Sequence, residues 1–236
     1  MSASAADAHP TDHRARDRLA LALDVGDWEA AEPLVTDLRP WFGIAKVGLE
    51  LYAEAGPDVV SRLHDLGVRV FADLKLYDIP NTVERAARAL GRRGVDFLNF
   101  AAVGGREMVA AGVTGVGEGA RASNRPPPVT LAVTVLTSEQ ETASFPDRLT
   151  VAVESGCRGV VCSAHEIAAA RDRGLRTMVP GVRFADDPTD DQARVATPGD
   201  AVARGADWLV VGRAVTRSSD PPAAAAAVAD AVAGAR

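Results

Sequence analysis

The chain has 236 residues, of which 47% are hydrophobic and 25% charged, a balance typical of globular proteins that excludes wholesale disorder. Lysine and arginine number 26 against 32 aspartates and glutamates, so the net charge of −6 lacks the basic surplus of a nucleic-acid-binding domain. Only two cysteines are present, which excludes a disulfide framework and fits a reducing cytoplasm. No run approaches the roughly 20 apolar residues of a membrane helix. We therefore expect a cytoplasmic protein that acts on a small molecule.

The amino-terminal segment differs from the rest of the chain. Residues 1–18 mix alanine, aspartate, histidine and arginine around no apolar core, so we predict a flexible tail rather than a signal peptide. Residues 19–236 show no linker and no break in composition, and they are predicted to form one domain.

Short apolar runs alternate with helical patterns throughout this domain. The runs are almost continuously apolar, as expected for parallel strands that are covered on both faces. Strands are predicted at residues 19–23, 44–47, 68–74, 95–100, 129–136, 159–162, 177–179 and 208–211.

Helical patterns lie between these runs. Segment 57–67 begins with proline and ends with glycine, which is the usual asymmetry of helix ends. Helices are also predicted at 28–38, where Pro33 weakens the pattern, and at 82–90. Two segments, 112–128 and 184–197, are predicted to be loops. Eight strands, each followed by a helix or a helix-like segment, predict a single-domain (β/α)₈ TIM barrel, with an open doubly wound α/β sheet as the alternative.

Charged residues stand at the ends of several predicted strands, where (β/α)₈ barrels place their chemistry. Strand alternation puts Asp73 and Lys75 on the same face as Phe71, so both are expected in the barrel mouth. Lys46 in the second strand and Asp78 beyond the third add two further charges. A single Asp–Lys pair is compatible with a structural ion pair, whereas four charges of alternating sign on one rim favour a catalytic site.

The end of the chain carries a candidate anion site. Segment 180–183 closes the seventh strand, and Gly212 and Arg213 follow the eighth. The loops after these two strands commonly bind phosphate in this fold. Gly212 allows close approach of the backbone, and Arg213 offers a guanidinium that binds phosphate through two N–H groups. We interpret the pair as a phosphate site, the alternative being a solvated arginine.

Together these motifs resemble the orotidine 5′-phosphate decarboxylase family, the enzymes of the last step of pyrimidine nucleotide synthesis. The resemblance covers about residues 19–221. Its Asp-x-Lys-x-x-Asp core at residues 73–78 is shared with sugar-phosphate decarboxylases and aldol-type synthases of the same suprafamily. The Leu-Thr-Ser segment at 136–138 and the Asp-Gln pair at 191–192 point to the orotidylate branch.

The resemblance implies a role for each matching residue. Lys75 would protonate the C6 carbanion, with Asp73 beside it and with Lys46 and Asp78 completing an alternating charge network. In this family the second aspartate, here Asp78, reaches across a homodimer interface together with Thr82. The substrate-binding residues would be Asp24 and Lys46 at the ribose hydroxyls, Thr137 and Ser138 beside the pyrimidine, and Arg183, Gln192, Gly212 and Arg213 around the phosphate and its closing loop.

The resemblance further implies conversion of orotidine 5′-monophosphate to UMP without a metal, flavin or pyridoxal cofactor. The expected partners are the substrate, the product and a second copy of the chain, with no nucleic acid or membrane. Two alternatives remain open. One is a related lyase of phosphorylated sugars or nucleotides, a class that usually involves Mg²⁺. The other is a specialised, inhibitor-resistant or catalytically silent protein that binds pyrimidine nucleotides.

One position departs from the family pattern. Ala101, at the end of the fourth predicted strand, stands where members commonly have histidine. The departure is either neutral or the mark of a copy that resists a nucleotide-like inhibitor or accepts a related nucleotide.

Overall fold

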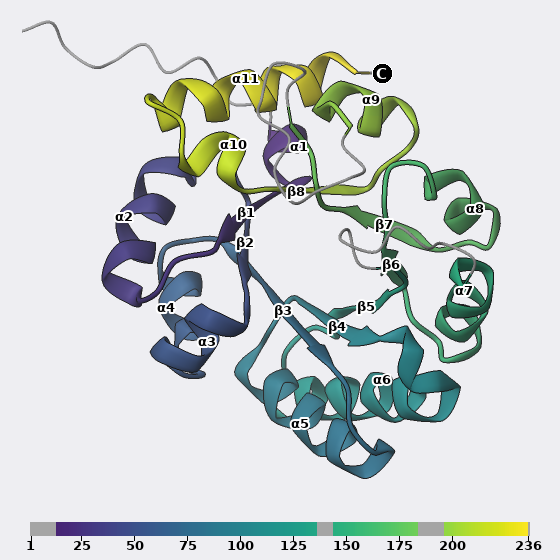
Figure 1. Ribbon diagram of the computed structural model, residues 1–236. Helices are drawn as coiled ribbons and strands as arrows, with labels where there is room; N and C mark the ends of the chain where they lie inside the picture. The colour runs from purple at the N-terminus through teal and green to yellow at the C-terminus, as the bar shows by residue number, and fades with distance from the viewer. Residues whose placement is uncertain (1–12, 136–143, 184–195, 236) are drawn as a thin grey trace, which may run out of the picture.

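In the computed structural model, which describes residues 13–135, 144–183 and 196–235, eight parallel strands close into a barrel. Strand β1 (Leu19–Leu23) pairs with β8 (Trp208–Val211) and so completes the ring (Figure 1). This pairing confirms the predicted (β/α)₈ barrel, because a doubly wound sheet would keep two free edges. The intervening strands are β2 (Ile44–Val47), β3 (Arg69–Leu76), β4 (Phe97–Ala101), β5 (Val129–Val133), β6 (Gly159–Val161) and β7 (Arg176–Val179).

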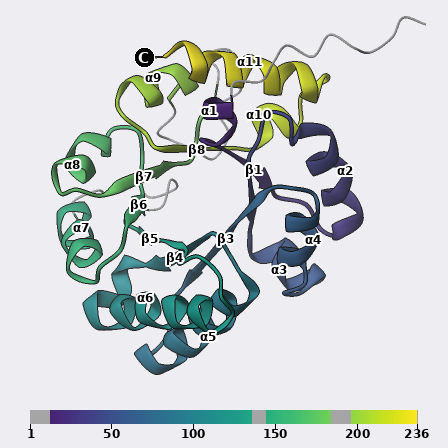
Figure 2. The ribbon, with the colours of Figure 1, turned by 180° about the vertical axis from the view of Figure 1, so that it is seen from behind.

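Helices surround the barrel on all sides, as both views show (Figures 1 and 2). Within the described residues, no helix has the length and apolarity needed to cross a membrane. The helices are α1 (His13–Arg16), α2 (Trp28–Leu38), α3 (Leu49–Ala55), α4 (Val59–Asp65), α5 (Pro80–Arg93), α6 (Gly105–Ala122), α7 (Phe145–Glu154), α8 (Ile167–Asp172), α9 (Pro198–Ala203), α10 (Arg213–Thr216) and α11 (Pro221–Gly234), with a 3₁₀ turn, η1 (Ala102–Gly104), after β4.

Helix α2 has the predicted bounds despite its internal proline. Asp27 caps its first turn, since the Asp27 side chain accepts a hydrogen bond from the Ala30 N–H at 2.8 Å. Pro33 lies on the exposed side of the helix, where the proline ring meets solvent instead of core side chains. Helix α3 is an addition that the sequence pattern did not predict.

The hydrophobic core has two layers, as expected for strands covered on both faces. The outer layer packs the strands against the helices. The inner layer fills the barrel and is built around three aromatic rings. The Phe97 ring meets Trp208 edge-on at 5.0 Å and Phe71 at 6.2 Å between centroids. These rings fill the barrel interior and leave the carboxyl ends of the strands for polar side chains.

The structure differs from the predicted tail at residues 13–18. Ala15 in α1 is buried, and the Arg16 carbonyl accepts a hydrogen bond from the Gly43 N–H at 2.8 Å. The Arg18 carbonyl accepts another from Leu209 in β8 at 2.9 Å. The short polar segment lacks an apolar pattern of its own, but its backbone groups are satisfied by the barrel. The folded part of the chain therefore begins before β1.

The prediction of a loop at 112–128 is wrong over residues 112–122, because helix α6 spans residues 105–122. Two of its glycines, Gly115 and Gly119, lie against the backbone of α5. A Cβ built on Gly115 would lie 2.2 Å from the Glu84 carbonyl oxygen, and one on Gly119 would lie 2.1 Å from that of Arg88. Glycine lowers helix propensity, but here it permits a helix contact that no larger residue would allow.

This packing predicts opposite effects for two glycines of the same helix. Gly115→Ala should lower the free energy of unfolding by about 1–3 kcal/mol, because the added methyl group overpacks the α5–α6 contact. Gly117→Ala is the matched control: a Cβ there meets nothing within 4 Å, so helix propensity should raise stability by up to about 1 kcal/mol. Urea unfolding of both variants measures the difference. Equal stability of the two would contradict the packing role.

Candidate active site

A pocket of about 420 Å³ opens at the carboxyl ends of the strands, the end that holds the site in barrels of this type. This volume lies within the usual range for small-molecule sites. Strands β1, β2, β3, β5, β6 and β8 contribute side chains to it, together with the segments that follow β7 and β8. The pocket therefore joins parts of the chain that are far apart in sequence.

Four charged side chains form a continuous row in this pocket. Lys46 Nζ lies 2.8 Å from Asp24 Oδ1 and 3.5 Å from Asp73 Oδ2. Lys75 Nζ lies 2.7 Å from Asp73 Oδ1. The central side chains, Lys46 and Asp73, are 11% and 14% exposed, whereas that of Lys75 is 37% exposed. The row alternates in sign, with a nearly buried centre and a lysine that remains accessible from the pocket.

The surroundings of Asp73 keep its carboxyl group ionised. Burial alone would raise the pKa of Asp73, because a buried carboxylate loses its hydration. The charges of Lys46 and Lys75, with hydrogen bonds from Lys75 and Asn99, outweigh burial and hold this pKa below its ordinary value. Asp73 is therefore a carboxylate at neutral pH, and it pairs with both lysines.

Strand β3 places Asp73 and Lys75 as the alternation predicts. Phe71 belongs to the inner layer of the core, while Val70 and Ala72 pack against the helices. Lys75 has φ of 48°, in the left-handed region that residues other than glycine rarely adopt. Its backbone N–H donates to Oδ1 of Asn99 at 2.7 Å. Lys75 thus has an unusual backbone conformation, with its N–H bonded to a side chain of β4, and its ammonium group lies in the pocket.

The segments after β7 and β8 build another side of the pocket. Gly181 has φ of 75°, so glycine permits the turn that follows Pro180. Gly212 and Arg213 follow β8 and line the pocket. A Cβ on Gly212 would lie 3.9 Å from Asp24 Oδ2, so the acidic end of the charged row adjoins the Gly212–Arg213 segment. The predicted anion site and the predicted charge cluster therefore share one pocket.

Arg183 is buried and also lines this pocket. Its backbone N–H donates to the Ala196 carbonyl at 3.1 Å, and Val182 and Ala196 form a parallel β-bridge. These contacts join Arg183 and Ala196, the described residues on either side of positions 184–195.

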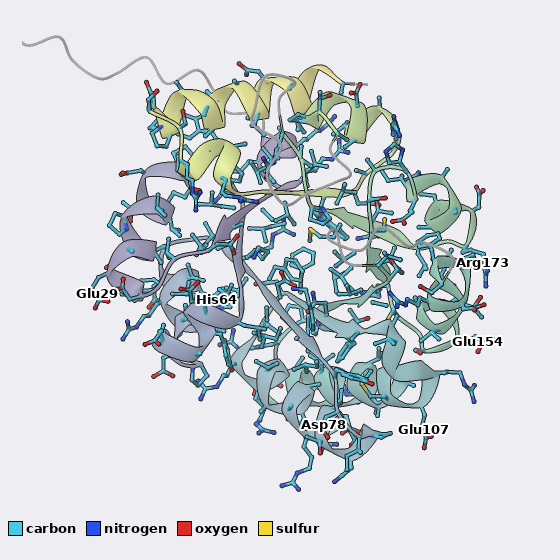
Figure 3. All side chains as sticks on the ribbon, in the orientation of Figure 1. Glu29, His64, Asp78, Glu107, Glu154 and Arg173 are labelled. Carbon is cyan, nitrogen blue, oxygen red and sulfur yellow. The ribbon has the colours of Figure 1, made fainter. Side chains whose placement is uncertain are left out.

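The structure corrects the expectation that Asp78 joins the row within one chain. Asp78 is exposed, is not part of the pocket lining, and its Oδ1 accepts a hydrogen bond from the Ile79 N–H at 2.6 Å. Figure 3 shows it at the outer edge of the molecule near α5. Thr82 in α5 is exposed as well and does not line the pocket. The reason is that β3 ends at Leu76, so the chain has already turned away from the barrel mouth.

Three further predicted residues, Thr137, Ser138 and Gln192, lie outside the residues that the structure describes. Ala101 is the last residue of β4 and is not among the residues that line the pocket. Nothing in the structure explains the alanine at this position. Over the described ranges, no group of three or more His, Cys, Asp or Glu side chains is arranged to hold a metal ion.

Sequence reasoning missed several residues of the site. Val133, Val135 and Val161 give the pocket an apolar wall, and Arg217 adds a third arginine to Arg183 and Arg213. The alternation of β5 would have indicated Val133. Asn99, which contacts both Asp73 and Lys75, was also missed, although a polar residue on the inner face of β4 was a usable signal.

Comparison with known proteins agrees with this geometry. The sequence model of the orotidine 5′-phosphate decarboxylase / HUMPS family matches residues 17–228. An orotidine 5′-phosphate decarboxylase of Moorella thermoacetica is 47% identical over 231 residues, covering 91% of this chain and 92% of that protein. One from Anaeromyxobacter sp. (strain K) is 46% identical over 228 residues, covering 90% and 97%.

Solved structures give the same result. The crystal structure of orotidine 5′-phosphate decarboxylase from Lactobacillus acidophilus superposes with a TM-score of 0.74 at 32% identity, covering 92% of this chain and 99% of that one. An uncharacterized conserved protein from Geobacillus kaustophilus gives 0.75 at 35% identity, covering 91% and 99%. From its sequence match and its relatives, the chain belongs to the orotidine 5′-phosphate decarboxylase / HUMPS family.

Proposed function

We propose that this protein is a carboxy-lyase that converts orotidine 5′-monophosphate to UMP in pyrimidine synthesis. The observation that carries the proposal is the row of Asp24, Lys46, Asp73 and Lys75 in one pocket with Arg213. A nucleoside monophosphate has a matching order of groups, with a phosphate at one end, hydroxyls in the middle and the reacting ring at the other end. The relatives that carry the decarboxylase name support the same substrate.

The arrangement of the pocket suggests how the substrate lies. Arg213 and the backbone at Gly212 bind the phosphate, with Gln192 as a further partner that the family resemblance implies. Asp24 and Lys46, 2.8 Å apart, bind the ribose hydroxyls beside this end. The pyrimidine then reaches Lys75 along the apolar wall, where the resemblance also places Thr137 and Ser138. Binding at the remote phosphate orients the ring for the reaction.

The reaction needs a positive charge at C6 of the ring. When the bond between C6 and the carboxylate breaks, CO₂ leaves and the electron pair stays on C6, where no ring carbonyl takes it up by simple conjugation. The Lys75 ammonium stabilises this pair and then transfers a proton from Nζ to C6. Solvent restores the proton on Nζ. Asp73, 2.7 Å from Nζ, fixes the ammonium in place throughout.

We also propose that the active form is a homodimer in which Asp78 and Thr82 complete the partner's site. Tyr77, Ile79 and Val103 are each at least 60% exposed and follow the ends of β3 and β4. Tyr77 and Val103 belong to one patch, since a Cβ on neighbouring Gly104 would lie 3.1 Å from the Tyr77 ring. Exposed apolar side chains of this size favour burial against a second copy. Asp78 lies within the patch and outside its own pocket, as a shared residue would.

The proposed compartment is the cytoplasm. Cys157 and Cys162 are buried thiols, which suits a reducing environment.

The decisive test of the reaction is the ultraviolet absorbance of orotidine 5′-monophosphate mixed with the purified protein. We expect the substrate absorbance to disappear, with and without a chelator, and Lys75→Ala to abolish turnover while it still binds UMP. Activity that is lost with the chelator would favour a Mg²⁺-dependent lyase. Binding of UMP by the wild-type protein without any absorbance change would favour a silent nucleotide-binding protein. Wild-type turnover in Lys75→Ala would refute the role of Lys75.

Loss of the phosphate contact should appear mainly in KM. Arg213→Ala removes charge-assisted hydrogen bonds, so we expect KM to rise about 10- to 100-fold. Steady-state kinetics with orotidine, which lacks the phosphate, should show no comparable difference between this variant and wild type. Arg217→Ala is the matched control, because Arg217 lines the same pocket but is exposed; its effect should be smaller. An unchanged KM in Arg213→Ala would remove Arg213 from the phosphate site.

A shared site predicts complementation between two inactive variants. Lys75→Ala and Asp78→Asn should each be nearly inactive alone. In a co-expressed mixture, each heterodimer holds one intact site, so about a quarter of wild-type activity should return. Activity of co-purified, differently tagged chains measures this. A mixture no more active than either parent would show that Asp78 does not act across the interface.

A further inference from the structure

The side chain of Asn99 bonds to both members of the proposed catalytic pair. Its Nδ2 donates to Asp73 Oδ1 at 2.6 Å, and its Oδ1 accepts from the Lys75 backbone N–H at 2.7 Å. Asn99 is fully buried in the interior of β4, the strand that contributes no side chain to the pocket lining. It therefore lies behind the reacting groups and does not reach the substrate.

The orientation of the Asn99 amide follows from its partners. A backbone N–H can only donate, so the atom that faces the Lys75 N–H must be the amide oxygen. The amide nitrogen then faces Asp73, a carboxylate that can only accept. Both ends of the side chain are thus satisfied in one orientation, and rotating the amide by 180° would break both bonds.

A local change of register explains why a side chain is needed here. Ala72 pairs with Leu98 and Leu76 pairs with Phe100, so residues 73–75 of β3 stand opposite Asn99 alone. Two extra residues in β3 take the Lys75 N–H out of the regular ladder, and Lys75 itself has a left-handed φ of 48°. The Asn99 oxygen supplies the acceptor that the strand backbone does not. The left-handed conformation of Lys75 and this hydrogen bond therefore occur together.

The same side chain fixes the carboxylate. Asp73 Oδ1 accepts from Asn99 Nδ2 and from Lys75 Nζ, while Oδ2 faces Lys46 at 3.5 Å. An amide donor holds the carboxylate without adding a charge, so it leaves the balance between the two lysines unchanged. A cationic side chain in place of Asn99 would compete with Lys75 for the Asp73 carboxylate.

We propose that Asn99 is a positioning residue, which holds the Asp73 carboxylate and the Lys75 backbone in the geometry required for proton transfer to the substrate. This inference rests on the proposed decarboxylation. It assigns to a residue of β4 part of the positioning of the reacting groups. The alternative is that Asn99 only stabilises the fold, as other buried polar residues do. The two roles differ in what they predict for kcat and for its pH dependence.

Asn99→Leu removes both hydrogen bonds at similar volume. We expect kcat to fall about 100-fold, the cost of misplacing a reacting group by about 1 Å, with KM changed less than about threefold because phosphate and ribose contacts remain. Thr177→Val is the matched control: Thr177 is fully buried, accepts from the Asp207 N–H at 3.2 Å and does not line the pocket. It should lower the melting temperature and leave kcat unchanged. If Asn99→Leu behaves like this control, the proposal is wrong.

Asn99→Asp gives a readout that a structural role would not produce. It keeps an acceptor for the Lys75 N–H but places a second carboxyl group where the amide donor was, 2.6 Å from Asp73 Oδ1. Two carboxyl groups this close share a proton, and the protonated one can donate. The kcat of this variant should therefore rise as pH falls, with an ionisation that wild type lacks. A pH profile parallel to wild type would contradict the proposal.

One measurement keeps the test independent of the reaction. In ¹³C NMR of the Asp73 carboxyl carbon, Asn99→Leu should show a higher Asp73 pKa than wild type, because a bond that favours the carboxylate is lost. An absence of decarboxylation by wild type would overturn the proposed function, and the titration would still decide whether Asn99 acts on Asp73. If Asn99→Leu does not fold, the near-isosteric Asn99→Asp replaces it. Its pH profile tests the positioning role, and the same titration tests whether residue 99 acts on Asp73.

Discussion

A buried carboxylate between two ammonium groups is the interaction on which the rest of the site depends. Breaking a buried ion pair by removing one partner typically costs about 3–5 kcal/mol, because a charge is then left without compensation, and this cost applies to the nearly buried pair of Lys46 and Asp73. The members of the cluster come from neighbouring strands. Lys46 in β2 pairs in register with Phe71 in β3, two residues before Asp73. Parallel strands about 4.8 Å apart hold the charged groups close enough to pair. The cluster therefore depends on the pairing of strands in the barrel.

The barrel interior separates this polar cluster from an apolar floor. Phe71, Phe97 and Trp208 occupy the inner layer of the core, and Asp73 and Asn99 follow at the next inward positions of β3 and β4. Aromatic rings on one side leave the carboxylate with protein partners in place of water. Electrostatic interactions strengthen when water is excluded, which makes each hydrogen bond to Asp73 count for more. The same inward-facing positions of the strands thus supply both the apolar packing of the barrel interior and the polar cluster at its carboxyl end.

Sequence patterns predicted most of the fold and the central part of the site, and the failures have physical causes. Continuous apolar runs marked β1, β2 and β8 with their observed bounds. Alternation alone placed Asp73 and Lys75 in the barrel mouth. The glycines of α6 suggested a loop because helix propensity is a local property, whereas two of them, Gly115 and Gly119, permit a close contact with α5. The inner face of β4 could have indicated Asn99 as a polar residue, but its partners could not be predicted, because the register change in β3 is a property of two strands together.

The closing pair of strands has a consequence for how the protein is made. Strand β1 is among the first segments to leave the ribosome, and its partner β8 is among the last. Until β8 emerges, one side of β1 has no partner and the chain ends before Gly212 and Arg213. A growing chain can therefore carry Asp24, Lys46, Asp73 and Lys75 while it still lacks Gly212 and Arg213. A ligand that needs the whole pocket can therefore stabilise the finished barrel but not the unfinished one.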